Sequence, residues 1–402
     1  ELPFGRAVIT TPFHGRPTTA LRCLTRPAFA LEPKPQPLSP LIVRPLLPPH
    51  SLFVTVSEDH TCKIFSYQAD GSLSCLETLS DFHDDVRAAS VVFVSRESQD
   101  PAWLLFLAGD KEVLHCYSVA LEGDAKSDKP ALSLESIGSC GGVTASSSRS
   151  WLKPTESLRD AIQQMDVRIM AMSAISLGGL SNILVLTGDS TGKLQLLRLD
   201  QDVGVFHRLG HDERHGCPIL CIELFSVTQL GCFAMSGDTS GRLVLWRIST
   251  EETVQLIRLK QFKVHQSGVN SVGFVSDARV VAVTGGDDQS IGLLSFTLSS
   301  EPAQNATTLG EVMFSRVSNA HSSSITAVRT GPGVIMTTGY DQRLRAWRMV
   351  NSKLQRVATL VLNVADVHTL DVTTDSENRW TAYVAGQGLQ IVQLKFDEAH
   401  SV

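Results

Sequence analysis

The chain has 402 residues, of which 43% are hydrophobic and 19% charged, a balance that favours a packed core and excludes disorder throughout. The formal net charge of −6 excludes a general attraction for nucleic-acid phosphates. Apolar stretches such as Trp103 to Ala108 are far shorter than the ~20 residues that span a bilayer, so we expect no membrane association. No basic leader opens the chain and its eight cysteines include no CxxC pair, which favours a cytoplasmic location.

One pattern recurs seven times along the chain: an apolar strand, a small turn with Gly or Asp, and a second apolar strand that ends on a large residue. The copies end at Phe65, Tyr117, Leu197, Trp246, Leu294, Trp347 and Val392. Five of the six intervals between these ends are 45 to 53 residues, close to the ~40–45 of a four-stranded propeller blade. The remaining interval, of 80 residues, predicts an insertion before the third copy.

Two segments are expected as long loops, at about 25–50 and 121–160. The first is rich in proline, which cannot serve an interior sheet ladder. The second includes the low-complexity segment 138–150 and a capping box at Ser157, which predicts a short helix to about Met165.

The two ends of the chain predict how the array closes. Arg6 to Thr10 reads as a strand placed before the first copy, whereas the seventh copy is followed only by a polar tail. We expect this strand to pair with the one around Leu389 to Leu394, which would close a ring and remove two sheet edges.

A histidine followed four residues later by a β-branched apolar residue precedes several copies. It occurs at His215, His265 and His321, with a shortened version at His83 and a related His14. In the sixth copy His321 is followed by a hydroxyl, a carboxylate and an indole, at Thr337, Asp341 and Trp347. Such groups are tolerated in a core only when they satisfy one another, so we expect a buried hydrogen-bonded tetrad.

Other copies keep parts of this tetrad. The fifth has His265, Thr284 and Asp288, and the first has His14, Thr55 and Asp59. In both, an apolar residue replaces the Trp. The fourth copy keeps His215, Ser236 and Trp246, with Ser240 where the carboxylate is expected. Copies two, three and seven are degenerate.

The seven-copy strand pattern and the histidine motif that precedes several copies occur in constant order, and together they resemble the WD-repeat family. The resemblance implies an all-β fold, a single seven-bladed WD-repeat β-propeller over residues 1–402 that is closed by the N-terminal strand and carries the two insertions.

The sequence contains residue types that could form a metal site or a catalytic site. His207, His211, His215, Cys217 and Cys221 are five zinc-type ligands within fifteen residues. The repeat already accounts for His215, however, and Cys221 falls on a buried strand, so we predict no metal. No GxSxG, P-loop or GxGxxG is present, and the notable Ser, His and Asp residues recur from copy to copy. We therefore predict no catalytic residue, no cofactor and no enzymatic activity.

A basic cluster lies near the sixth copy and is the candidate contact surface. It comprises Arg343, Arg345, Arg348, Lys353 and Arg356, with Arg329 before them. Such a cluster could contact RNA phosphates or an acidic partner. The alternative is ordinary solubility of outer strands, because Lys63, Lys193 and Arg242 occupy corresponding points of other copies.

Several short segments resemble one member family more closely. They are Phe13-His14-Gly15-Arg16, His115-Cys116-Tyr117-Ser118, Asp341-Gln342-Arg343-Leu344 with Trp347-Arg348, Val364-Ala365-Asp366-Val367 and Gly386-Gln387-Gly388-Leu389. Together they are similar to the C-terminal part of the large WD-repeat proteins that partner the FtsJ-type tRNA ribose methyltransferase.

That resemblance implies a cytoplasmic, non-catalytic subunit of a complex, and this chain would correspond to about the last third of such a protein. The methyltransferase partner would supply the S-adenosylmethionine site, and the propeller would help present tRNA, contacted through the complex, for 2′-O-methylation at the wobble nucleotide. A protein–protein adaptor, such as a ubiquitin-ligase substrate receptor or a trafficking scaffold, is the competing hypothesis, because this fold serves many functions.

Overall fold

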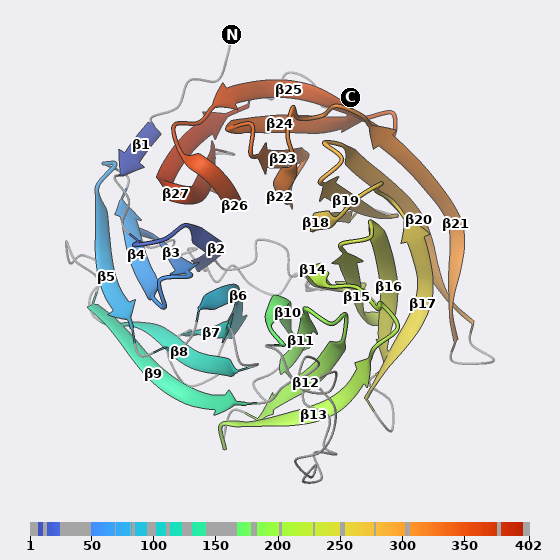
Figure 1. Ribbon diagram of the computed structural model, residues 1–402, viewed down its shortest axis with the longest axis horizontal. Coiled ribbons are helices and arrows are strands. Elements are labelled where there is room, and N and C mark those ends of the chain that lie inside the picture. Colours follow the sequence, from blue (N-terminus) through green and yellow to red (C-terminus); the bar gives the residue numbers. More distant parts are fainter. Residues whose placement is uncertain are drawn as a thin grey trace, which may run out of the picture.

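A computed structural model describes residues 7–10, 14–24, 50–68, 70–80, 82, 85–94, 102–109, 113–122, 131–141, 167–177, 183–200, 203–227, 230–249, 254–276, 279–301, 306–375 and 379–396. These residues form seven antiparallel sheets that are arranged in a ring around a common centre (Figure 1). The predicted seven-bladed β-propeller is confirmed. Within these ranges, no helix has the length and hydrophobicity needed to cross a membrane.

Six blades each take four consecutive strands from the sequence. Blade 1 is β2 (Thr18–Leu24), β3 (His50–Ser57), β4 (Cys62–Gln68) and β5 (Leu73–Leu79); blade 2 is β6 (Val86–Val94), β7 (Ala102–Gly109), β8 (Leu114–Glu122) and β9 (Ala131–Cys140). Blade 3 is β10 (Ile169–Ser176), β11 (Ile183–Asp189), β12 (Leu194–Asp200) and β13 (Val205–Asp212); blade 4 is β14 (Ile219–Val227), β15 (Gly231–Asp238), β16 (Arg242–Ser249) and β17 (Gln255–Lys263). Blade 5 is β18 (Val269–Ser276), β19 (Val280–Gly286), β20 (Ile291–Glu301) and β21 (Ala306–Val317); blade 6 is β22 (Ile325–Gly331), β23 (Val334–Gly339), β24 (Arg343–Val350) and β25 (Lys353–Val361).

Blade 7 joins the two ends of the chain. It consists of β26 (Ala365–Thr374), β27 (Arg379–Lys395) and β1 (Ala7–Thr10). The first part of β27 pairs with β26, and its later part pairs with β1, with Ala7 opposite Val392 and Thr10 opposite Leu389. The predicted closure by an N-terminal strand is confirmed, and it protects an edge of the last blade that would otherwise be open.

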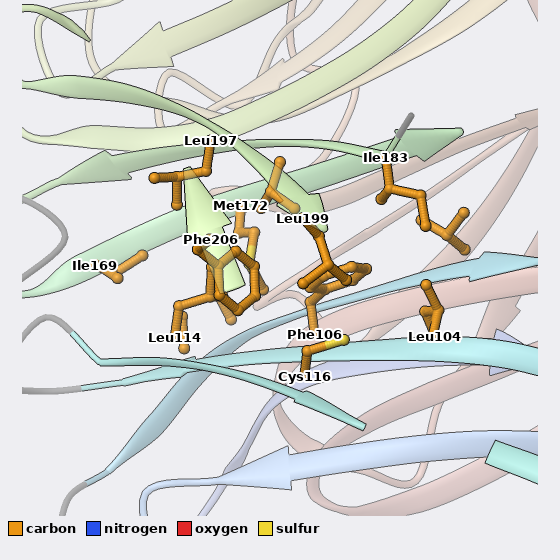
Figure 2. Close-up of a cluster of buried hydrophobic side chains, with 14 of the residues drawn as sticks. Leu104, Phe106, Leu114, Cys116, Ile169, Met172, Ile183, Leu197, Leu199 and Phe206 are labelled. Carbon is orange, nitrogen blue, oxygen red and sulfur yellow. The ribbon is translucent and has the colours of Figure 1, made fainter. Parts of the chain in front are cut away.

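The core lies between neighbouring blades, because each blade packs one face against the preceding blade and the other face against the following blade. Strands β11 and β19 are therefore buried along their whole length, and each begins with four consecutive apolar residues rather than with an alternating pattern. Figure 2 shows one such layer, where Phe106 of blade 2 meets Phe206 of blade 3 with ring centroids 6.4 Å apart. The fourth strands face outward, and β17 is largely exposed.

The two expected insertions fall mainly on residues outside the described ranges, as do the predicted helix from Ser157 to Met165 and the shortened mark at His83. The interval 121–160 is nevertheless not one loop. It contains β9, the fourth strand of blade 2, in which Gly138 lies opposite Cys116. A blade needs this outer strand, and the alternation of β9 serves that role although its end is low in complexity.

Candidate functional site

In blade 6 the structure brings the four expected polar side chains together as a relay. Trp347 Nε1 donates to Thr337 Oγ1 at 2.9 Å, and the same hydroxyl lies 2.8 Å from His321 Nε2. His321 Nδ1 lies 2.9 Å from Asp341. Because an indole nitrogen only donates, the Thr337 hydroxyl accepts from it and directs its own proton to Nε2, which leaves the Nδ1 proton for the carboxylate. The relay ties the loop before β22 to the second and third strands.

Blade 4 forms the same relay with a carboxylate from another position. Trp246 Nε1 donates to Ser236 Oγ at 2.8 Å, and that hydroxyl lies 2.7 Å from His215 Nε2. The acceptor of the His215 Nδ1 proton is Asp238, at 3.0 Å, rather than the expected position at Ser240. Ser240 instead donates to Asp238 at 2.6 Å. The expectation that this blade lacks its carboxylate is therefore wrong.

The space around the histidine explains why the carboxylate can change position. Asp238 takes the strand position that Gly286 and Gly339 occupy in blades 5 and 6. A Cβ at Gly286 would lie 2.5 Å from His265 Nδ1, so this position holds glycine in those two blades. There, a carboxylate from the following turn bonds to the histidine instead. Sequence reasoning missed Asp238 because it searched one spacing only.

A second occurrence of this variant could have revealed it. Residues 188–194 of blade 3 read GDSTGKL, and residues 237–243 of blade 4 read GDTSGRL. Asp189 of blade 3 is fully buried and accepts hydrogen bonds from the backbone of Thr191 and Lys193, although this blade has no relay histidine. The carboxylate at this position therefore serves first to hold the turn between the second and third strands.

Blades 5 and 1 form shorter relays that lack the indole. His265 lies 2.8 Å from both Thr284 and Asp288, and His14 lies 3.0 Å from the hydroxyl of Thr55. Asp59 lies 3.1 Å from the other nitrogen of His14. The position of the Trp is filled by buried Leu294 and Phe65, the residues found at the ends of these copies. The hydroxyls therefore bond to histidine without an indole donor.

The relays hold neutral imidazoles against ionised carboxylates. Burial lowers the pKa of His321, His265 and His14, although the facing carboxylate opposes this shift in each case. Burial alone would raise the pKa of Asp288, but bonds from Ser290, the Gln266 backbone and His265 outweigh it and leave a pKa of about 2. Because both ring nitrogens are bonded and the rings are buried, these histidines are not available as catalytic bases.

The five zinc-type ligands do not converge. His207 and His211 are exposed on β13, whereas His215 belongs to the blade 4 relay. Cys221 is buried on β14, where its thiol donates to the carbonyl of Val269 at 3.3 Å. Across the part of the chain that the structure describes, no three His, Cys, Asp or Glu side chains are placed to share a metal ion.

The basic cluster divides among three places. Arg329 lies on an inner strand and binds Asp371 at 3.2 Å. Arg345 is buried, forms an ion pair with Asp341 at 3.1 Å and donates to the carbonyl of Ala320. The remaining members lie on the two outer strands of blade 6: Arg343 and Arg348 on β24, and Lys353 and Arg356 on β25.

The corresponding basic residues of other blades also have structural roles. Arg242 binds Asp238 at 2.8 Å, in the same four-residue spacing as Arg345 and Asp341. Lys193 is buried and lies 3.3 Å from Glu213. Solubility of outer strands therefore does not explain Arg242 or Lys193, and the exposed pair Lys353 and Arg356 is what remains of the cluster as a contact surface.

Comparison with known proteins agrees with this architecture. The WD domain, G-beta repeat family model matches residues 257–293. The mouse (Mus musculus) protein named tRNA (34-2′-O)-methyltransferase regulator WDR6 is 23% identical over 386 residues, covering 85% of this chain and 34% of the relative. The chain thus spans about a third of the length of that relative.

Two solved structures have the same fold. The RRP9 WD40 repeats match with a TM-score of 0.56 at 11% identity, covering 98% of this chain and 99% of that one. Saccharomyces cerevisiae Sqt1 matches with a TM-score of 0.58 at 10% identity, covering 98% of this chain and 100% of that one. Together with the seven blades and their relays, these similarities show that the chain has the seven-bladed β-propeller fold, with a match to the WD, G-beta repeat at residues 257–293.

Proposed function

We propose that this chain is a non-catalytic scaffold that binds a tRNA ribose 2′-O-methyltransferase and supports methylation of the wobble nucleotide. The observation that carries this proposal is the similarity over 386 residues to a relative named as a regulator of such an enzyme. The scaffold role itself is supported by the propeller fold, which offers broad rigid surfaces between short loops. The wobble position is inferred from the relative's name, which gives nucleotide 34.

The chemistry of the site supports a binding role rather than a catalytic one. Residue types that act as bases and nucleophiles elsewhere are here engaged in the relays, as His321 is with Thr337 and Asp341. Such groups stabilise the blades and have no access to a substrate. In the proposed complex, the methyltransferase therefore supplies the cofactor and the reacting groups.

Charge supports indirect rather than direct contact with tRNA. The chain has a formal net charge of −6, and its basic cluster is divided, with Arg345 engaged in an ion pair. Phosphate binding depends on several cations that act together, so a dispersed set gives little affinity. We place the complex in the cytoplasm, where free thiols persist, because all eight cysteines of the chain are unpaired.

Deletion of the gene in its source organism tests the proposal. We expect loss of 2′-O-methylation at the wobble nucleotide, mapped by mass spectrometry of purified tRNA, and recovery when the gene is re-expressed. Methylation elsewhere in the same tRNA is the internal control. Unchanged wobble methylation would overturn the proposal and favour the adaptor hypothesis, which predicts the same fold without any effect on tRNA.

A further inference from the structure

An apolar groove of about 620 Å³ opens between blades 5 and 6. This 5/6 groove is lined by Arg279, Val281, Leu293, Met313, Met349 and Ser352, among others. Val281 and Leu293 form a buried floor, while Met313 and Met349 are 40% and 38% exposed on its two sides. Its size lies within the range of ligand-binding pockets, and exposed methionines are typical of surfaces that adapt to a protein partner.

The groove exists because small side chains replace aromatic ones at this seam. Phe225 pairs with Phe233 at the seam between blades 4 and 5, where Phe225 also packs on Phe274 with ring centroids 4.1 Å apart. At the corresponding point of the next seam, the paired residues are Val275 and Val281. The smaller valines leave space that aromatic rings fill one blade earlier.

A rigid turn forms one end of the groove. Asn351 and Ser352 both have positive φ, 50° and 59°, between the paired residues Val350 and Lys353. This is the backbone of a two-residue hairpin turn of type I′, in which glycine is preferred at the second position. Glycine, the preferred residue at this turn position, has no side chain, whereas Ser352 places a side chain at the groove.

The charge beside the groove is positive, although the whole chain is acidic. Arg356 lies opposite Trp347 in the blade 6 sheet, on the face turned toward blade 5, whereas Lys353 lies opposite Val350 and is turned to the other face. Among the described residues, Arg356 has no carboxylate within ion-pair distance. Arg279, on the other side, is already paired with Glu311 at 3.2 Å. This cation beside an apolar floor complements a segment that carries apolar side chains and a carboxylate.

We propose that the 5/6 groove binds an amphipathic, acidic segment of the methyltransferase subunit. This inference rests on the proposed function and adds to it the surface of contact. A protein segment fits better than RNA, because Val281 and Leu293 form an apolar floor and a single cation, Arg356, does not give the several phosphate contacts that RNA binding needs. Met313 and Met349 would contact its apolar side chains, and Arg356 a carboxylate.

The test measures the affinity of the purified chain for the methyltransferase of the same organism by isothermal titration calorimetry. Met313→Glu places a carboxylate at an exposed point of the groove, and we expect at least a tenfold loss of affinity. Arg356→Glu should weaken binding several-fold and reduce its dependence on salt. Ile257→Glu is the matched control, because Ile257 is 37% exposed on the corresponding outer strand of blade 4. It should bind as wild type, and all variants should keep the wild-type melting temperature.

The outcomes separate this inference from the proposed function. If the enzyme binds wild type and Met313→Glu equally well, the groove is overturned while the proposed function stands. If the enzyme does not bind wild type, both are overturned. A labelled tRNA anticodon stem-loop is the second probe. A change in its affinity on Arg356→Glu, with unchanged methyltransferase affinity, would identify an RNA surface and overturn the inference.

Discussion

Blades 4 and 6 form the same relay from different sequences. In both, the indole follows the hydroxyl residue by ten positions, as in Ser236 and Trp246. The carboxylate differs, since Asp238 comes from the end of the second strand whereas Asp341 comes from the turn. What the fold requires is an acceptor beside the Nδ1 atom of histidine, and either backbone position can supply it.

The surroundings of the two carboxylates also differ. Asp238 is fully buried and accepts bonds from His215, from Ser240 and from the backbone and side chain of Arg242. Asp341 lies in the turn, where it accepts bonds from His321 and Ser322 and pairs with Arg345. Blade 4 therefore depends more strongly on its carboxylate, although the relays have the same order of donors and acceptors.

The largest expected effect comes from removing the indoles. Trp246→Ala and Trp347→Ala should each lower the free energy of unfolding by ~3–5 kcal/mol, because a large buried side chain and a hydrogen bond to the hydroxyl are lost together. Urea denaturation of both variants measures this loss. A loss below ~1 kcal/mol in either blade would show that its indole is not part of a packed relay. Leu294→Ala, in the blade that lacks an indole, is the apolar reference.

Neutralising the carboxylates should have a smaller effect that separates the two blades. We expect Asp238→Asn to cost about 3 kcal/mol and Asp341→Asn about 2 kcal/mol, because Asp238 is more enclosed and leaves more buried donors without a charged acceptor. The double variant Asp238→Gly, Ser240→Asp copies the blade 6 arrangement and should recover part of the loss. Equal costs in both blades, with no recovery in the double variant, would contradict the comparison.

Much of the fold could be predicted from the sequence because it is repeated. The seven copies, the tetrad of His321 and the strand at Ala7–Thr10 all follow from patterns local to a blade. Asp238 was missed because a fixed spacing was assumed where only the position of the acceptor matters. A blade that tolerates either position cannot be recognised by one spacing.

Features that depend on neighbouring blades were harder to predict. Side chains alternate along a strand, so Arg345 and Arg348 of one basic run face opposite sides, and Arg345 is buried against Asp341. The 5/6 groove depends on Val275 and Val281 where the preceding seam has phenylalanines. Such a difference becomes visible only when the strands of two blades are aligned in register.

The smallest expected effect is the response to acid, which separates the imidazoles of the relays from the carboxylates. The pKa of His321 is lowered by burial from its ordinary 6.5, so the unfolded chain takes up a proton before the folded chain does. The contribution of the neutral imidazole to the free energy of unfolding is therefore fully present above about pH 6.5 and is lost as the pH decreases below that value. Asp288, with a pKa of about 2 against an ordinary 3.8, adds a second loss only in stronger acid.

His321→Gln tests the first of these two stages. Glutamine can still hydrogen-bond in the relay but does not titrate, so the free energy of unfolding of the variant should decrease less than that of wild type between pH 7 and pH 5. The slopes, measured by urea denaturation at intervals of half a pH unit, should converge again once the imidazole is protonated in both the folded and the unfolded chain. His207→Gln is the control, because His207 is exposed on β13 and belongs to no relay. A slope for His321→Gln equal to that of wild type would mean that the imidazole of blade 6 binds protons equally in both states, and the acid response would then belong to the carboxylates alone.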